Sequence, residues 1–151
     1  MIGRGGRRIP ERDAWNHIAG YACYNDASVR DWQMHTGQWC PGKNFWRTGA
    51  FGPWMVTADE IPPGTVMTLV TRLNGTEVQR ATTDMMLHSI SRLIAYASTV
   101  APLQAGDVIV TGTPGGIGAK RNPPLWMKAG DSVEVEVDRI GVLSNPVIDE
   151  A

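Results

Sequence analysis

The sequence has little cysteine, almost no net charge and no long apolar run. Its 151 residues include 2 cysteines, 14 basic and 15 acidic residues, for a formal net charge of −1. This balance gives no chain-wide field that would attract nucleic acid or an anionic membrane. No apolar run approaches the roughly 20 residues that span a bilayer. We therefore expect no nucleic-acid and no membrane partner, and we interpret Cys23 and Cys40 as reduced thiols of a cytoplasmic protein.

Length and composition favour one domain over residues 1–151, because a chain that is 42% hydrophobic can bury a real core. Its 17 glycines and 10 prolines punctuate short apolar segments. The alternating and apolar segments predict strands over 19–24, 54–57, 66–73, 107–110 and 133–137, with a hairpin turn at Asn74-Gly75. Helices are predicted over 10–17 and 28–35, and from the apolar stripe that follows the N-cap Ser89. The class is therefore α+β, mainly β, with peripheral helices.

The segments 24–33 and 41–45 mix acids, bases and amides with apolar residues. A strand ending near residue 24 would deliver Asp26, and a helical turn from residue 28 would place Asp26, Arg30 and Gln33 on neighbouring faces. With Lys43 nearby, the set indicates an anionic ligand beside a metal or an acid/base group. Each residue also has a structural interpretation: Asp26 as a helix cap, Arg30 as a surface charge and Lys43 as a solvated loop lysine.

The glycine-rich segment 112–118 does not fit a nucleotide-binding loop, because it lacks the Gly-x-Gly-x-x-Gly spacing and any helical pattern after it. A strand followed by a loop with free backbone N–H groups and the Thr113 hydroxyl can bind a carboxylate. A simple tight turn is the alternative. We interpret the three histidines as structural or surface residues, and the six tryptophans as packing in the core and at a subunit interface.

Several of these segments together resemble the fumarylacetoacetate hydrolase family, in order and at the family's spacing. The matching motifs are Asn25-Asp26-x-Ser28-x-Arg30-Asp31-x-Gln33, Gly42-Lys43-x-Phe45, Gly52-Pro53-Trp54, Leu73-Asn74-Gly75 with Gln79, and the segments 106–118, 128–131 and 141–147. The resemblance implies a rolled, mixed β-sheet of barrel-like form. It also implies that the chain is the C-terminal part of such a protein, with two metal-binding glutamates and a His–Glu lid upstream of Met1.

By this resemblance, Asp26 is a ligand of Mg²⁺ or Mn²⁺, and Arg30, Gln33, Lys43 and Thr113 bind substrate. Lys43 is also catalytic, as an electron sink for an enolate. The substrate class is a small 2-oxo or β-diketo carboxylic acid, and the assembly is a homodimer.

Three functions remain open at this point. The first is metal-dependent hydrolysis of a C–C bond in a small acylpyruvate or β-diketo acid, of the fumarylpyruvate or fumarylacetoacetate type, through a metal-stabilised enolate. The second is isomerisation of the 2-hydroxyhepta-2,4-diene-1,7-dioate type, or decarboxylation of the oxaloacetate type. The third is a catalytically inactive dimerising or ligand-binding module. A DNA-associated role, prompted by four arginines within residues 4–12, has less support because the remaining charges are balanced.

Overall fold

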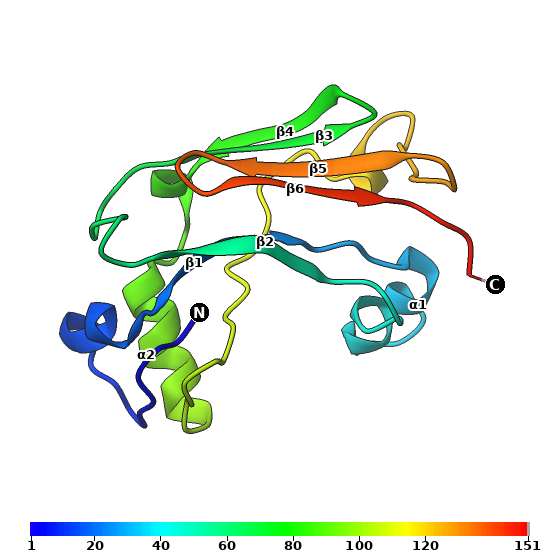
Figure 1. Ribbon diagram of the computed structural model, residues 1–151. Coiled ribbons are helices and arrows are strands. Elements are labelled where there is room, and N and C mark those ends of the chain that lie inside the picture. The colour runs from blue at the N-terminus through cyan, green and yellow to red at the C-terminus, as the bar shows by residue number, and fades with distance from the viewer. Residues whose placement is uncertain (151) are drawn as a thin grey trace.

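The computed structural model describes residues 1–150 and consists of two stacked β-sheets with helices at the periphery (Figure 1). The strands are β1 (Gly20–Asn25), β2 (Ala50–Thr57), β3 (Thr68–Leu73), β4 (Thr76–Thr82), β5 (Ser132–Val137) and β6 (Gly141–Pro146). The helices are α1 (Arg30–Met34) and α2 (Ile90–Val100), with short 3-10 turns η1 (Glu11–His17), η2 (Cys40–Lys43), η3 (Thr83–Met85) and η4 (Gly118–Lys120).

The smaller sheet pairs β1 with β2, and the larger one has the order β4-β3-β5-β6. All strand pairs between these named elements in residues 1–150 are antiparallel. The mainly β class with peripheral helices is therefore confirmed. The two sheets stay open over the described residues, so the mixed, barrel-like form that the resemblance implied is not confirmed.

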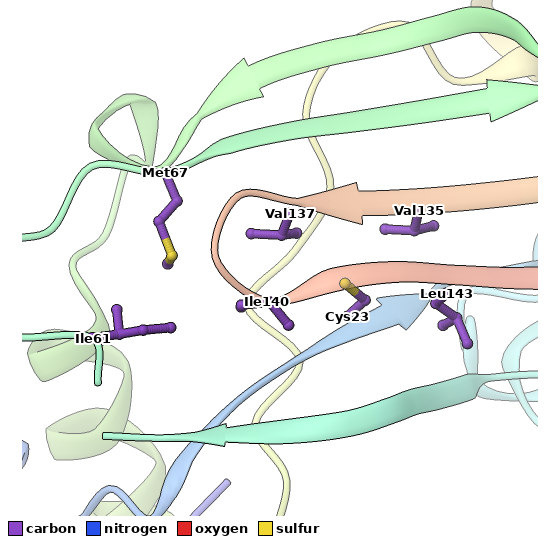
Figure 2. Packing of buried hydrophobic residues seen from close by; sticks show 7 residues of the cluster. All are labelled: Cys23, Ile61, Met67, Val135, Val137, Ile140 and Leu143. Carbon is purple, nitrogen blue, oxygen red and sulfur yellow. The ribbon is translucent and has the colours of Figure 1, made fainter. Parts of the chain in front are cut away.

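The core fills the space between the two sheets (Figure 2). It consists of Cys23, Ile61, Met67, Val135, Val137, Ile140 and Leu143. In β5 the buried valines alternate with more exposed acidic residues, as period-two patterning predicts for a half-covered strand. The predicted turn between β3 and β4 is also confirmed, since Asn74 and Gly75 both have a positive φ, the left-handed pair of a type I′ turn.

A second cluster, made of Ile2, Ile9, Ala14 and Ile94, joins α2 to the N-terminal segment. Ser89 caps α2 as predicted, because its hydroxyl accepts a hydrogen bond from the Arg92 backbone N–H. Over residues 1–150, no helix has both the length and the apolar character that a membrane crossing requires.

Some sequence expectations are wrong. Residues 107–110 form no strand; the Asp107 carbonyl instead accepts a backbone hydrogen bond from Ile2, and Ile109 packs on the N-terminal cluster. β2 begins at Ala50 rather than at residue 54, and α1 is shorter than 28–35. The predicted helix over 10–17 is a 3-10 turn.

The tryptophans also depart from expectation, because none of the six lies in the buried core of residues 1–150. Trp46 is 76% exposed and Trp54 is 58% exposed. The two cysteines are free thiols as predicted, and Cys23 is buried whereas Cys40 is exposed.

Candidate functional site

Asp26 follows directly after the C-terminal end of β1. The residue before it, Asn25, donates from Nδ2 to Asn145 Oδ1 at 3.1 Å, which ties the end of β1 to β6 across the two sheets. Asp26 does not cap the following helix, because Val29 holds the N-cap position of α1 and no side chain caps it. The capping interpretation of Asp26 is therefore excluded.

The Asp26 carboxylate is paired with Lys43 from η2. Lys43 Nζ donates to Asp26 Oδ2 at 2.7 Å, and the two side chains are 30% and 32% exposed. Lys43 is thus not a freely solvated loop lysine. A half-buried ion pair of this kind leaves both charges partly accessible to a ligand while restricting their positions.

Gly42 explains how Lys43 reaches this position. A Cβ at residue 42 would overlap Gln33 Cβ and would lie 2.5 Å from the Gln33 backbone nitrogen, so only glycine allows η2 to lie this close to α1. The Val29 N–H also donates to the Gly42 carbonyl at 2.9 Å. The Trp32 and Phe45 rings meet edge to face at 5.5 Å, which holds the chain after η2 against α1.

Arg30 and Gln33 form a second pair, one helical turn apart on α1. Arg30 donates from one guanidinium nitrogen to Gln33 Oε1 at 2.6 Å. Gln33 is only 4% exposed, so its amide fixes the direction of the Arg30 side chain. The predicted direct contact of Gln33 with substrate stays a prediction.

Thr113 lies on a loop that is held against β4. Gln79 donates from Nε2 to Thr113 Oγ1 at 3.2 Å and to the Pro114 carbonyl at 3.0 Å. Among the hydrogen bonds of residues 1–150, none joins Thr113 to the side chains of the two pairs. The structure therefore brings four predicted site residues together in two pairs and leaves Thr113 on a separate element.

Gln79 is the residue of this region that was not predicted to belong to the site. Its hydrogen-bond partner Thr113 lies 34 positions further along the chain, so no local sequence pattern links the two.

The described residues do not by themselves make a site for a divalent cation. Nowhere in residues 1–150 do three or more His, Cys, Asp or Glu side chains gather as metal ligands. Asp26 is the predicted ligand, yet its carboxylate faces the Lys43 ammonium at 2.7 Å. Mg²⁺ needs several oxygen ligands in near-octahedral geometry, and one carboxylate neutralised by a lysine does not supply them. Asp26 as a metal ligand therefore stays a prediction.

The arrangement places two cationic side chains, Arg30 on α1 and Lys43 on η2, on elements that pack against each other. The Arg30 guanidinium can bind a carboxylate through a two-pronged contact. The Lys43 ammonium is a compact charge that can stabilise an oxyanion. Figure 1 shows α1, which carries Arg30, at the end of the molecule away from α2.

Sequence comparison gives relatives along nearly the whole chain. Oxaloacetate tautomerase fahd2, mitochondrial, from Xenopus laevis is 43% identical over 150 residues, which are 98% of this chain and 47% of the relative. The chain thus spans about half the length of the curated relatives it matches.

Solved structures agree in fold. Fumarylacetoacetate hydrolase from psychrophilic Exiguobacterium antarcticum has a TM-score of 0.95 and 36% identity, covering 99% of this chain and 54% of that one. A 5-carboxymethyl-2-hydroxymuconate delta-isomerase from Mycobacterium smegmatis has a TM-score of 0.89 and 39% identity, covering 99% and 56%. Fumarylpyruvate hydrolase from Pseudomonas aeruginosa, in complex with Mn²⁺ and pyruvate, has a TM-score of 0.88 and 32% identity, covering 99% and 62%.

The family described as fumarylacetoacetate (FAA) hydrolase C-terminal matches residues 1–148. That match covers both sheets, the Asp26–Lys43 pair, the Arg30–Gln33 pair and the Thr113 loop. The chain belongs to the fumarylacetoacetate hydrolase family.

Proposed function

We propose that this chain supplies the substrate-binding and enolate-stabilising part of an enzyme that hydrolyses a C–C bond in a small acylpyruvate or β-diketo acid, of the fumarylpyruvate or fumarylacetoacetate type. The observation that carries the proposal is the Lys43–Asp26 pair, held beside α1 by the close approach of Gly42 to Gln33. The relatives named as hydrolase, isomerase and tautomerase act on small acids, which supports a 2-oxo acid substrate.

Arg30 is proposed to bind the terminal carboxylate of the substrate. Its guanidinium is oriented by Gln33, so part of the entropy cost of fixing the side chain is met before the ligand arrives. Thr113 is proposed to donate its hydroxyl hydrogen to a second oxygen of the substrate. The Arg30 contact selects a carboxylic acid over a neutral ketone.

Lys43 is proposed to act on the reaction itself. Water adds to the carbonyl of the acyl group, and the bond between that carbon and the pyruvyl methylene breaks. For an acylpyruvate, the bonding electrons remain on the pyruvyl fragment as an enolate, which takes up a proton and leaves as pyruvate, while the acyl group leaves as a carboxylic acid. The Lys43 ammonium stabilises the enolate oxygen, a charge that is largest in the transition state.

Among the relatives, the fumarylpyruvate hydrolase was solved with Mn²⁺. A need for Mg²⁺ or Mn²⁺ in this protein is part of the proposal. Because the described residues do not fit such an ion on their own, we assign no step of the reaction to it.

Isomerisation and oxaloacetate-type chemistry are second candidates, because both also pass through an enolate that Lys43 could stabilise. The Mycobacterium smegmatis isomerase and the Xenopus laevis tautomerase support them. A non-catalytic ligand-binding module is the third. A cytoplasmic location stays a prediction, since the Xenopus laevis relative is named as mitochondrial.

The test joins this chain to the part of the Pseudomonas aeruginosa fumarylpyruvate hydrolase that precedes the matched stretch. Pyruvate release from fumarylpyruvate would support the hydrolase. A change in substrate absorbance without cleavage would indicate an isomerase, and loss of carbon dioxide from oxaloacetate would indicate a decarboxylase.

The variant Arg30→Lys should raise KM with little change in kcat, because Lys lacks the two-pronged contact but keeps the charge. Arg80→Lys, at an exposed position of β4, is the control. Oxalate binding without turnover of any of these acids would favour the non-catalytic module.

A further inference from the structure

Gln79 on β4 bridges to the loop that follows residue 112. Its Nε2 lies 3.2 Å from Thr113 Oγ1, 3.0 Å from the Pro114 carbonyl oxygen and 3.3 Å from the Gly115 carbonyl oxygen. The orientation of the amide follows from these neighbours, because a flipped amide would point Oε1 at two carbonyl oxygens. The nitrogen must therefore face the loop, and Gln79 is a donor to it.

A second side chain and a glycine hold the same loop. Arg121 donates from Nε to the Gly116 carbonyl at 3.0 Å and also donates to the Val78 carbonyl on β4. A Cβ at residue 116 would lie 2.8 Å from the Val78 carbonyl oxygen, so only glycine allows the loop to approach β4 so closely. Gln79 thus acts on a loop whose position relative to β4 is already fixed.

The direction of the Gln79–Thr113 hydrogen bond has a chemical consequence. A hydroxyl has one hydrogen to donate and two lone pairs that accept. When Thr113 Oγ1 accepts from Gln79, its own hydrogen stays available for a ligand. The hydroxyl hydrogen is then directed away from Gln79, where it can be donated to a carboxylate or enolate oxygen of a ligand.

We propose that Gln79 is a positioning residue that sets the Thr113 hydroxyl as a donor toward an acidic ligand. The inference rests on the proposed function of Thr113 in substrate binding and deepens it, since it states which ligand atoms the loop selects. Gln79 does not contact the ligand itself. It acts by fixing the rotamer and the donor role of Thr113.

The sharpest variant is Gln79→Glu, which keeps the size and shape of the side chain and replaces its donor by acceptors. The carboxylate would take the Thr113 hydrogen and would repel the Pro114 and Gly115 carbonyl oxygens. Glu77→Gln is a matched control with the reverse exchange on the same strand, because Glu77 is exposed and pairs only with Arg80 in residues 1–150.

Oxalate is the probe, titrated by calorimetry into the purified chain and its variants. Thr113→Val should weaken oxalate binding by about tenfold, the usual effect of losing a hydrogen bond to a charged ligand. Gln79→Glu should weaken binding at least as much. The double variant should bind no more weakly than the poorer single variant, because both changes remove the same contact. Glu77→Gln should bind as the parent chain does.

Two outcomes separate failure of this inference from failure of the proposed function. If Thr113→Val weakens binding and Gln79→Glu does not, or if the two losses add, the positioning role is overturned and the proposed function stands. The proposed function fails if the parent chain binds no oxalate. It also fails if Thr113→Val, Arg30→Lys and Lys43→Met all bind oxalate as the parent chain does. In either case the role of Gln79 is overturned as well. Should Gln79→Glu not fold, Gln79→Met removes the donor without adding charge and is interpreted in the same way.

Discussion

Lys43 Nζ lies 2.7 Å from Asp26 Oδ2, so the cation proposed to stabilise an enolate and the carboxylate proposed to bind a metal neutralise each other. Each group is already engaged by the other, although both side chains stay partly accessible to a ligand. A ligand that draws Lys43 toward its own oxygen would expose Asp26. The two residues therefore form one functional unit, and variants of either one test both.

The first prediction concerns turnover. In the fusion protein described above, Lys43→Met should lower kcat by about a hundredfold or more and change KM only a few-fold, because the enolate charge exists chiefly in the transition state. Steady-state assays with fumarylpyruvate measure this. Lys128→Met, at an exposed position, is the control. An unchanged kcat in Lys43→Met would remove Lys43 from the catalytic site.

The second prediction concerns metal affinity. The chain itself should bind Mg²⁺ and Mn²⁺ weakly, because Asp26 is the one predicted carboxylate ligand and Lys43 competes for it. Lys43→Met should strengthen binding of Mn²⁺ by removing the competing charge. Calorimetry of each ion, alone and with oxalate, is the measurement. Micromolar affinity in the parent chain would mean that other carboxylates, such as Asp31 or Asp59, complete a site.

The third prediction concerns the packing of η2 on α1. Gly42→Ala should destabilise the chain by about 1–3 kcal/mol, because the added methyl group would overlap the Gln33 backbone and force the two elements apart. Urea denaturation followed by circular dichroism measures the change in the free energy of unfolding.

Gly37→Ala is the matched control for Gly42→Ala. Nothing lies within 4 Å of a Cβ at residue 37, so this change should be nearly neutral. Equal stability of Gly42→Ala and the parent chain would show that the close approach of η2 to α1 does not exist in solution.

The fourth prediction concerns pH. The hydrogen bond from the Asn74 amide, with one from the Lys128 backbone N–H, holds the pKa of Asp131 below its ordinary value of 3.8. A carboxyl whose pKa is lowered by folding stabilises the fold above its unfolded pKa, and this stabilisation is lost as the pH falls through the folded pKa. Asn74→Gly keeps the left-handed turn and removes the donor, so the Asp131 pKa should rise toward 3.8.

Titration of the Asp131 carboxyl carbon by NMR measures this shift. Asp138 is the internal control, because its pKa is lowered by hydrogen bonds from Thr68 and should not respond. An unaltered Asp131 midpoint in Asn74→Gly would show that the amide does not hold the carboxylate.

The fifth prediction is that the chain forms a homodimer. Large apolar side chains remain on the surface, among them Trp39 at 63% and Trp46 at 76% exposure. Burying such residues is a common reason for association. Sedimentation velocity at micromolar concentration should show a species of twice the chain mass. A single monomeric boundary over that range would contradict the prediction.

The sequence predicted those elements whose signals are local. The alternating valines of β5, the Asn74-Gly75 turn and the Ser89 cap each depend on neighbouring residues, and each is confirmed. The apolar run after Asp107 failed as a strand because its partners are Ile2 and the N-terminal cluster, which no local pattern reveals.

The candidate site divides in the same way. Arg30 and Gln33 lie one turn apart, so spacing on a helix was enough to predict that they meet. The contact of Asp26 with Lys43 depends on Gly42, because only a glycine there lets η2 pack directly against Gln33. That packing is a tertiary contact, which the sequence alone does not predict. Gln79 entered the sequence comparison only as part of the hairpin motif, because a glutamine in a hairpin strand has no local pattern that points to the distant Thr113 loop.

The strand order β4-β3-β5-β6 also bears on how the chain reaches its fold. β3–β4 and β5–β6 are each hairpins of adjacent segments, whereas the β3–β5 seam joins Leu73 to Val133 across α2 and the whole Thr113 loop. Closing the long loop between β3 and β5 costs entropy before any β3–β5 contact forms. We therefore expect β3 and β5 to pair later than the two hairpins do. Amide protons of β3 that bond to β4 should accordingly become protected during refolding before those that bond to β5.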